Sequence, residues 1–94
     1  RRVLFRSIEL NPKSSDLYNE RGMVYYSLGE NLKALEDYNK AIELDSTNAE
    51  AYYNRGIIYK LLAKDRNLDK KKKAEYKALE EKDRKKYQEL TKES

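Results

Sequence analysis

The fold of this chain is decided by residues 15–48, which read SDLYNERGMVYYSLGENLKALEDYNKAIELDSTN. Residues 49–63 follow as AEAYYNRGIIYKLLA and resemble the start of that stretch. A shift of 34 residues pairs Tyr18 with Tyr52, Arg21 with Arg55, Gly22 with Gly56, Tyr25 with Tyr59 and Leu28 with Leu62. Several matches in one register, with aromatic and glycine positions among them, indicate an internal repeat.

The first half of each unit has helical spacing. Tyr18, Gly22 and Tyr25 fall at positions i, i+4 and i+7, which lie on one face of a helix. Leu28 closes this helix, and Gly29 follows as a stop signal. The sequence therefore predicts a helix that opens near residue 15 and ends before Gly29.

A second helix is predicted from Asn31, which is a suitable N-cap. Its inward face carries Ala34, Tyr38, Ala41 and Ile42. Thr47 and Glu50 have the spacing of a capping box, so the next helix is expected to begin with the Thr47 hydroxyl and the Glu50 carboxylate bound to free amides.

This alternation of large and small residues resembles the signature of the tetratricopeptide repeat (TPR). The residues that carry the resemblance are Tyr18, Gly22, Tyr25, Ala34, Tyr38 and Ala41. The resemblance implies an all-α fold, built from antiparallel helix-turn-helix repeats of an α-solenoid. Residues 15–48 correspond to a complete repeat, and residues 1–14 include the end of the preceding repeat's second helix. Residues 49–63 correspond to the first helix of the next repeat, and residues 64–94 to a long, charged, degenerate second or capping helix.

Residues 1–7 have a different character. They read RRVLFRS and resemble the translated end of a common sequencing-library adaptor. The close self-match of the repeat begins at Ile8 and fails before it. Our hypothesis is that native sequence begins near Ile8 and that the chain is a fragment of a longer array.

Composition argues against catalysis. The chain has 94 residues, no Cys and no His, which removes thiolate chemistry, the usual zinc ligands and the commonest general base. Charged residues make up 40% of the chain, and its hydrophobic fraction of 38% is below the roughly 45–50% of globular proteins. We therefore expect no enzyme activity, no catalytic residue, no bound metal and no cofactor.

The family resemblance implies a scaffold that binds a partner peptide or helix in a concave groove. The groove is lined by the first helix of each repeat, which here gives Asp16, Asn19, Glu20, Met23, Tyr26, Glu50, Tyr53, Asn54, Ile57 and Lys60. Some relatives grip the terminal carboxylate of chaperone tails through Lys and Asn side chains. Asn54 matches one of those positions, but Asn19 and Met23 replace two others, so we expect an apolar or aromatic-bearing peptide instead.

Two alternatives remain open. The basic C-terminal helix, which contains the run Lys70–Lys73, would bind RNA or another anionic surface, or the chain would be the docking domain of a larger enzyme. Acidic residues such as Asp69 and Glu75 flank the lysines, and no aromatic residues are interleaved for base stacking, so nucleic acid is not the expected partner. We expect a monomer without a membrane span, located in the cytoplasm.

The adaptor hypothesis makes a direct prediction. Sequencing of the full-length transcript across the junction between Ser7 and Ile8 is expected to show repeat-like residues, such as an aromatic and an alanine, in place of Leu4 and Ser7. Genuine coding of residues 1–7 would contradict the hypothesis and would make the basic N-terminus a native feature.

Overall fold

The computed structural model describes residues 2–92. Over this range the chain is all-α and has the repeated helix-turn-helix arrangement that the sequence predicted. The helices are α1 (Arg2–Leu10), α2 (Ser15–Ser27), α3 (Asn31–Leu44), α4 (Ala49–Ala63) and α5 (Lys70–Thr91). Arg1, Glu93 and Ser94, which the sequence analysis included in its first and last segments, lie outside the described residues.

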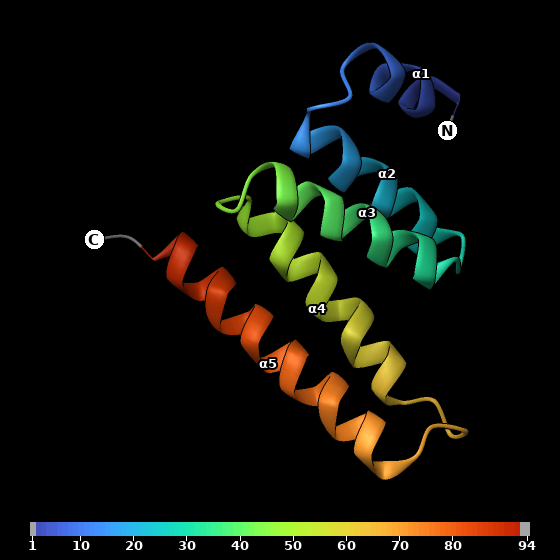
Figure 1. Cartoon of the computed structure of the whole chain (residues 1–94), viewed down its shortest axis with the longest axis vertical. Helices are drawn as coiled ribbons and strands as arrows, with labels where there is room; N and C mark the ends of the chain where they lie inside the picture. The colour runs from blue at the N-terminus through green and yellow to red at the C-terminus, as the bar shows by residue number, and fades with distance from the viewer. Residues whose placement is uncertain (1, 93–94) are drawn as a thin grey trace.

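The helices pack as two antiparallel pairs, α2 with α3 and α4 with α5 (Figure 1). The pairs are joined where α3 packs on α4, and α2 also contacts α4. Helix α1 lies against α2 at one end of the array. The molecule measures 42 × 38 × 18 Å, and its thinnest dimension is about two helix diameters. The array is therefore a plate two helices thick, as stacked helical hairpins require.

Helix α2 stops at Gly29, as predicted. Gly29 has a φ of +79°, a left-handed conformation that glycine adopts without a Cβ penalty. The Glu30 amide donates to the Tyr25 carbonyl at 2.9 Å, and the Gly29 amide donates to the Tyr26 carbonyl at 3.0 Å. These two bonds form a Schellman motif, which satisfies carbonyls that would otherwise have no partner at the helix end.

The predicted N-caps of α3 and α4 are wrong by one residue. Glu30 is the N-cap of α3, and Asn31 is the first residue inside that helix. Helix α4 is capped by the Asn48 side chain, which accepts from the Ala51 amide at 3.3 Å. Thr47 instead belongs to the preceding turn.

The capping box was not formed because both of its side chains have other partners. The Thr47 hydroxyl donates to Asp45 at 2.6 Å, and the Glu50 carboxylate accepts from Asn19 on α2 at 2.9 Å. The contact of Glu50 with α2 and the bond of Thr47 to Asp45 in the turn therefore replace the capping box that the local sequence pattern predicted.

The core lies between α2, α3 and α4. It is formed by Tyr25, Ala34, Tyr38 and Ile58, with Phe5, Leu35 and Leu62 packed around them. Ala34 and Ala41 are fully buried, which lets the α3 backbone approach its neighbours closely. Of the tyrosines at the repeat positions, Tyr25, Tyr38, Tyr52 and Tyr59 are buried and Tyr18 is half-buried. Burial raises the pKa of Tyr38 well above its ordinary value of 10, so this hydroxyl stays protonated in the folded chain.

Residues at the N-terminus take part in this packing. The Phe5 ring meets the Tyr25 ring edge-on, with 6.2 Å between centroids. The Arg21 guanidinium lies 4.9 Å from the centroid of the Phe5 ring, a cation–π distance. Residues 2–7 are thus helical and Phe5 contacts the core, whereas the origin of these residues stays a hypothesis.

Helix α5 differs from the other helices in being highly charged along its length. Asp83 is its one fully buried residue within the described range, and the Tyr76 ring stacks on Tyr59 with 6.0 Å between centroids. The helix begins at Lys70, where the Asp69 side chain caps it by accepting from the Lys72 amide at 2.8 Å. Within residues 2–92, no helix has both the length and the apolar character needed to cross a bilayer.

Gly22 and Gly56 occupy equivalent repeat positions but have different surroundings. A Cβ added at Gly22 would lie 2.6 Å from Cε1 of Tyr38, whose side chain is buried in the core with 1% of its surface exposed. A Cβ added at Gly56 would meet its nearest neighbours at 3.5 and 3.8 Å, which is ordinary contact.

We therefore expect opposite effects from the same substitution. Gly22→Ala should lower the free energy of unfolding by about 1–3 kcal/mol because it overpacks the core. Gly56→Ala should leave the stability unchanged or raise it by about 1 kcal/mol, since alanine is the better helix former. Urea denaturation followed by circular dichroism measures both, and equal losses for the two variants would contradict this account.

Candidate partner-binding surface

Helices α2 and α4 carry the predicted groove residues, and the structure places these residues at different depths. Seven of the ten are exposed: Asp16, Glu20, Met23, Tyr26, Glu50, Tyr53 and Lys60. Asn54 and Ile57 are half-buried, and Asn19 is buried with 4% of its surface exposed. Nine of the ten predicted groove side chains are therefore at least partly exposed to solvent.

Asn19 lies in the joint between the two helices. Its side-chain amide donates to the Glu50 carboxylate at 2.9 Å, and its side-chain oxygen accepts from the Asn54 amide at 3.0 Å. Near the helix starts, the Asn48 amide donates to the Ser15 hydroxyl at 2.8 Å. These bonds fix α2 against α4, so Asn19 supports the surface from beneath.

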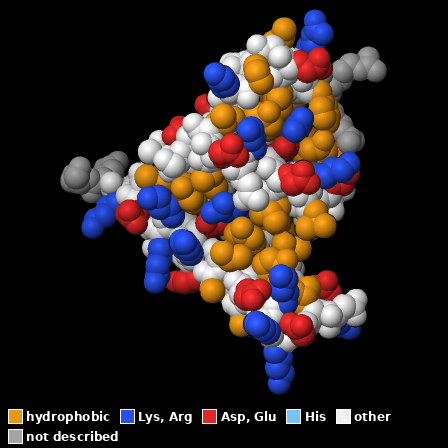
Figure 2. All heavy atoms as spheres, viewed as in Figure 1, with side chains coloured by type: hydrophobic (Ala, Val, Ile, Leu, Met, Phe, Trp, Pro, Cys, Tyr) orange, Lys and Arg blue, Asp and Glu red, His pale blue; other side chains and the backbone are white. Residues whose placement is uncertain are grey.

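Four apolar side chains stand on this surface, namely Met23, Tyr26, Tyr53 and Ile57. The first three are 44%, 41% and 51% exposed, which is high for large apolar groups on packed helices. The Tyr53 ring rests against Tyr87 of α5 with 5.0 Å between centroids. On the face drawn in Figure 2, hydrophobic side chains gather in patches over the helix junctions, with lysines, arginines and acidic groups around them.

Two buried ion pairs hold the helices of each pair in register. Arg21 on α2 binds Asp37 on α3 through two bonds, Nε to Oδ2 and Nη2 to Oδ1, each 2.8 Å long. Arg55 on α4 binds Asp83 on α5 through the same atoms at 2.9 and 2.7 Å. Both are bidentate pairs, which fix orientation as well as distance.

The internal repeat pairs Arg21 with Arg55, but the carboxylate partners of the two arginines were not predicted from the sequence. The hydrogen bonds to Asp37 raise the pKa of Arg21. Burial opposes the charged form of Arg55, but the hydrogen bonds and charge of Asp83 outweigh it, and the pKa of Arg55 is also raised. An arginine repeated on an apolar helix face is the signal that could have revealed these pairs, since a half-buried guanidinium needs a carboxylate.

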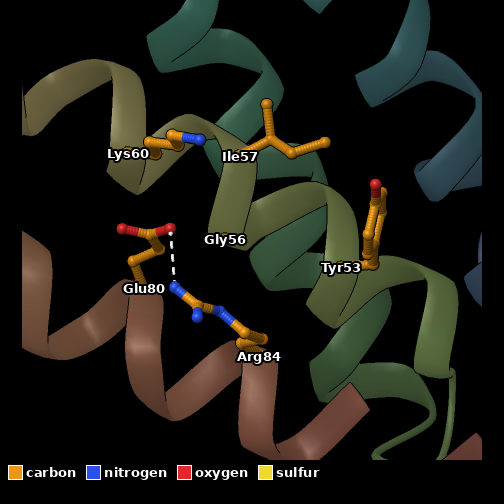
Figure 3. A pocket seen from close by; sticks show the side chains of 6 residues that line it. All are labelled: Tyr53, Gly56, Ile57, Lys60, Glu80 and Arg84. Carbon is orange, nitrogen blue, oxygen red and sulfur yellow. Dashed lines mark hydrogen bonds and ion pairs between the residues drawn. The ribbon is translucent and has the colours of Figure 1, made fainter. Parts of the chain in front are cut away.

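A cavity of about 340 Å³ lies between α4 and α5. Tyr53, Gly56, Ile57 and Lys60 line it from α4, and Glu80 and Arg84 line it from α5. Figure 3 shows the side chains of the two helices on opposite sides of this space, with an ion pair between Arg84 and Glu80 at one side. Three of the predicted groove residues therefore open onto a hollow, and α5 supplies two further lining residues, Glu80 and Arg84, that were not among the predicted groove residues.

Comparison with protein families identifies the repeat. A family model described as "TPR repeat" matches residues 22–62, and one described as "Tetratricopeptide repeat" matches residues 4–36. The chain belongs to the tetratricopeptide-repeat family. Searches of curated proteins and of solved structures gave no match.

TPR arrays are in general modules for interaction between proteins. Membership in the family therefore supports a protein-interaction scaffold and a protein partner as the broad function of this chain. The identity of the residues that contact the partner stays a prediction. Asn54, which matches a carboxylate-gripping position of some TPR proteins, donates its side-chain amide to Asn19.

The lysine run lies at the start of α5. Lys70, Lys71 and Lys72 are exposed, and Lys72 forms an ion pair with Glu75 at 3.6 Å. A second hollow of about 430 Å³ lies at the other edge of the α4–α5 contact, where Lys82, Lys85 and Lys86 surround the Arg55–Asp83 pair. Positive charge on this TPR array is thus spread along α5.

The Arg55–Asp83 pair makes a testable contribution to stability. Asp83→Asn is expected to lower the free energy of unfolding by about 2 kcal/mol, because it leaves the guanidinium of Arg55 with a neutral acceptor in a half-buried position. The control is Lys72→Gln on the same helix, which breaks an exposed pair and should cost less than about 0.5 kcal/mol. Chemical denaturation measures both values, and an equally small effect at Asp83 would contradict a register-setting role.

Proposed function

We propose that this TPR array binds a peptide or helix of a partner protein along the surface formed by α2 and α4. The observation that carries the proposal is the exposure of Met23, Tyr26 and Tyr53 on helices whose other large side chains are packed. Apolar and aromatic groups of this kind are the ones that most often dominate binding at protein interfaces. The chain is proposed to act as a monomeric scaffold and to catalyse no reaction.

The surface is held in shape before the partner arrives. The bonds of Asn19 to Glu50 and Asn54 tie the two helices together, and the Tyr53 ring already rests on Tyr87. Binding to a preformed surface loses less conformational entropy than binding to a mobile one. The mechanism is therefore burial of a few partner side chains on a rigid helical face.

Charges at the ends of the surface would set the direction of the partner. Asp16 and Glu50 lie in the first turns of α2 and α4, Glu20 lies near the middle of α2, and Lys60 lies near the end of α4. A partner with a basic residue toward the first end and an acidic residue toward the second would complement them. Such rim charges affect selectivity and association rate more than final affinity.

Selection from a random peptide library displayed on phage tests this proposal. Peptides that bind the chain should lose about tenfold in affinity with Met23→Ala or Tyr26→Ala, because an apolar anchor is removed. The control is Leu32→Ala, which removes an exposed leucine from α3, outside the proposed surface. Isothermal titration calorimetry measures the affinities.

The same titrations separate this function from binding by the basic helix. Affinity that falls steeply with salt, and that disappears when Lys70–Lys73 are changed to Gln, would overturn the proposal in favour of an anionic partner. Affinity that is nearly independent of salt and sensitive to Met23 supports the α2–α4 surface.

A further inference from the structure

We propose that the cavity at Gly56 is a socket for one aromatic side chain of the partner, presented beside a carboxylate. This inference rests on the proposed function and specifies the partner's chemistry at one point of the surface. The two helical pairs of this chain differ at this point of the surface.

The two ion pairs give the correspondence between the pairs. Asp37 lies 16 residues after Arg21, whereas Asp83 lies 28 residues after Arg55, yet the same atoms are joined at nearly the same distances. Asp83 therefore takes the place of Asp37. The next residue along each helix is Tyr38 in the first pair and Arg84 in the second, so an arginine stands where the first pair has an aromatic ring.

In the first pair that ring fills the space over the glycine. A Cβ built on Gly22 would lie 2.6 Å from Cε1 and 2.9 Å from Cδ1 of Tyr38. In the second pair the nearest atoms to the corresponding point at Gly56 are Cβ of Asp83 at 3.5 Å and the carbonyl oxygen of Glu80 at 3.8 Å. No ring covers Gly56, and the cavity of about 340 Å³ lies there.

The walls of the cavity suit a ring. Tyr53 and Ile57 line it, and the contact of Tyr53 with Tyr87 holds the Tyr53 ring in place (Figure 3 shows Tyr53 and Ile57 along α4). The volume is at the lower end of the ~300–1,000 Å³ of ligand sites, so it accepts one side chain but not a folded segment. The planar guanidinium of Arg84 can lie against an aromatic face, which an aliphatic side chain does not offer.

The charges around the cavity favour an acidic neighbour of that ring. Arg84 is shared between Glu80 and Glu81, with 3.3 Å to each carboxylate. Lys60 is exposed and forms no ion pair with another residue of the range 2–92. A partner carboxylate beside the aromatic residue would form an ion pair with Lys60, because Lys60 has no such pair within residues 2–92.

The test is a titration of the ¹⁵N-labelled chain with a defined probe, acetyl-Asp-Tyr-Asp-amide, followed by NMR. Amide shifts should concentrate at Tyr53, Gly56, Ile57 and Arg84. The probe with leucine in place of tyrosine should bind about tenfold more weakly, and the probe with both aspartates changed to asparagine should bind about threefold more weakly. Equal binding of the tyrosine and leucine probes, or shifts located elsewhere, would overturn the proposal.

Two variants fill the socket from within the chain. Arg84→Tyr restores the ring that Tyr38 provides in the first pair, and Gly56→Ala places a methyl group on the cavity floor. Both should fold, Arg84→Tyr should raise the midpoint of thermal unfolding, and both should weaken the tyrosine probe by about tenfold or more. Unchanged binding of the probe to a folded variant would contradict the socket.

The outcome for the socket is separable from that for the whole surface. Peptides selected against the chain can be titrated with Met23→Ala, which lies on α2, away from the cavity. If Met23→Ala weakens them and Arg84→Tyr does not, the surface is used without the socket. If neither variant has an effect, the proposed function itself fails.

Discussion

The bidentate contact between Arg55 and Asp83 is the interaction on which the C-terminal half of the molecule depends. Helix α5 is long and highly charged, and Asp83 is the one residue of its described part that is fully buried. Two aromatic contacts also join it to α4, the Tyr53–Tyr87 and Tyr59–Tyr76 ring pairs. The bidentate geometry of this buried ion pair allows one register of α5 on α4, and that register determines which side chains line the cavity at Gly56.

The α2–α3 pair has the same ion-pair geometry, but there packing provides most of the stability. There the Arg21–Asp37 pair accompanies an aromatic ring and two small residues, Ala34 and Ala41, that are fully buried. Burial of such groups is the main favourable contribution to the free energy of folding. An ion pair mainly fixes the relative orientation of the two helices. The two TPR hairpins thus share the bidentate ion pair but differ in the residue beside it, which is the buried Tyr38 in the first and Arg84 in the second.

Most of the fold could be predicted from the sequence because α2, α3 and α4 carry periodic apolar residues and a repeated glycine. The helix ends were less predictable, since the choice between Thr47 and Asn48 as the cap depends on contacts of Asp45 and Asn19 that no local pattern contains. The register of α5 was beyond prediction because its aromatic and alanine residues do not follow the repeat. The buried position of Asn19 was missed for a related reason: an amide on a polar helix face becomes structural only when α4 supplies its partners.

The close contact between Gly22 and Tyr38 also constrains how this array can diverge. Because the ring occupies the space where any Cβ would lie, a larger residue at position 22 is compatible with the fold only alongside a smaller one at position 38. The two sites are therefore expected to covary among descendants of this sequence, with neither drifting alone. Gly56 is less restricted, since no ring faces it and a methyl group fits there at ordinary contact distances, so the second hairpin can accept a change at this position without loss of the core.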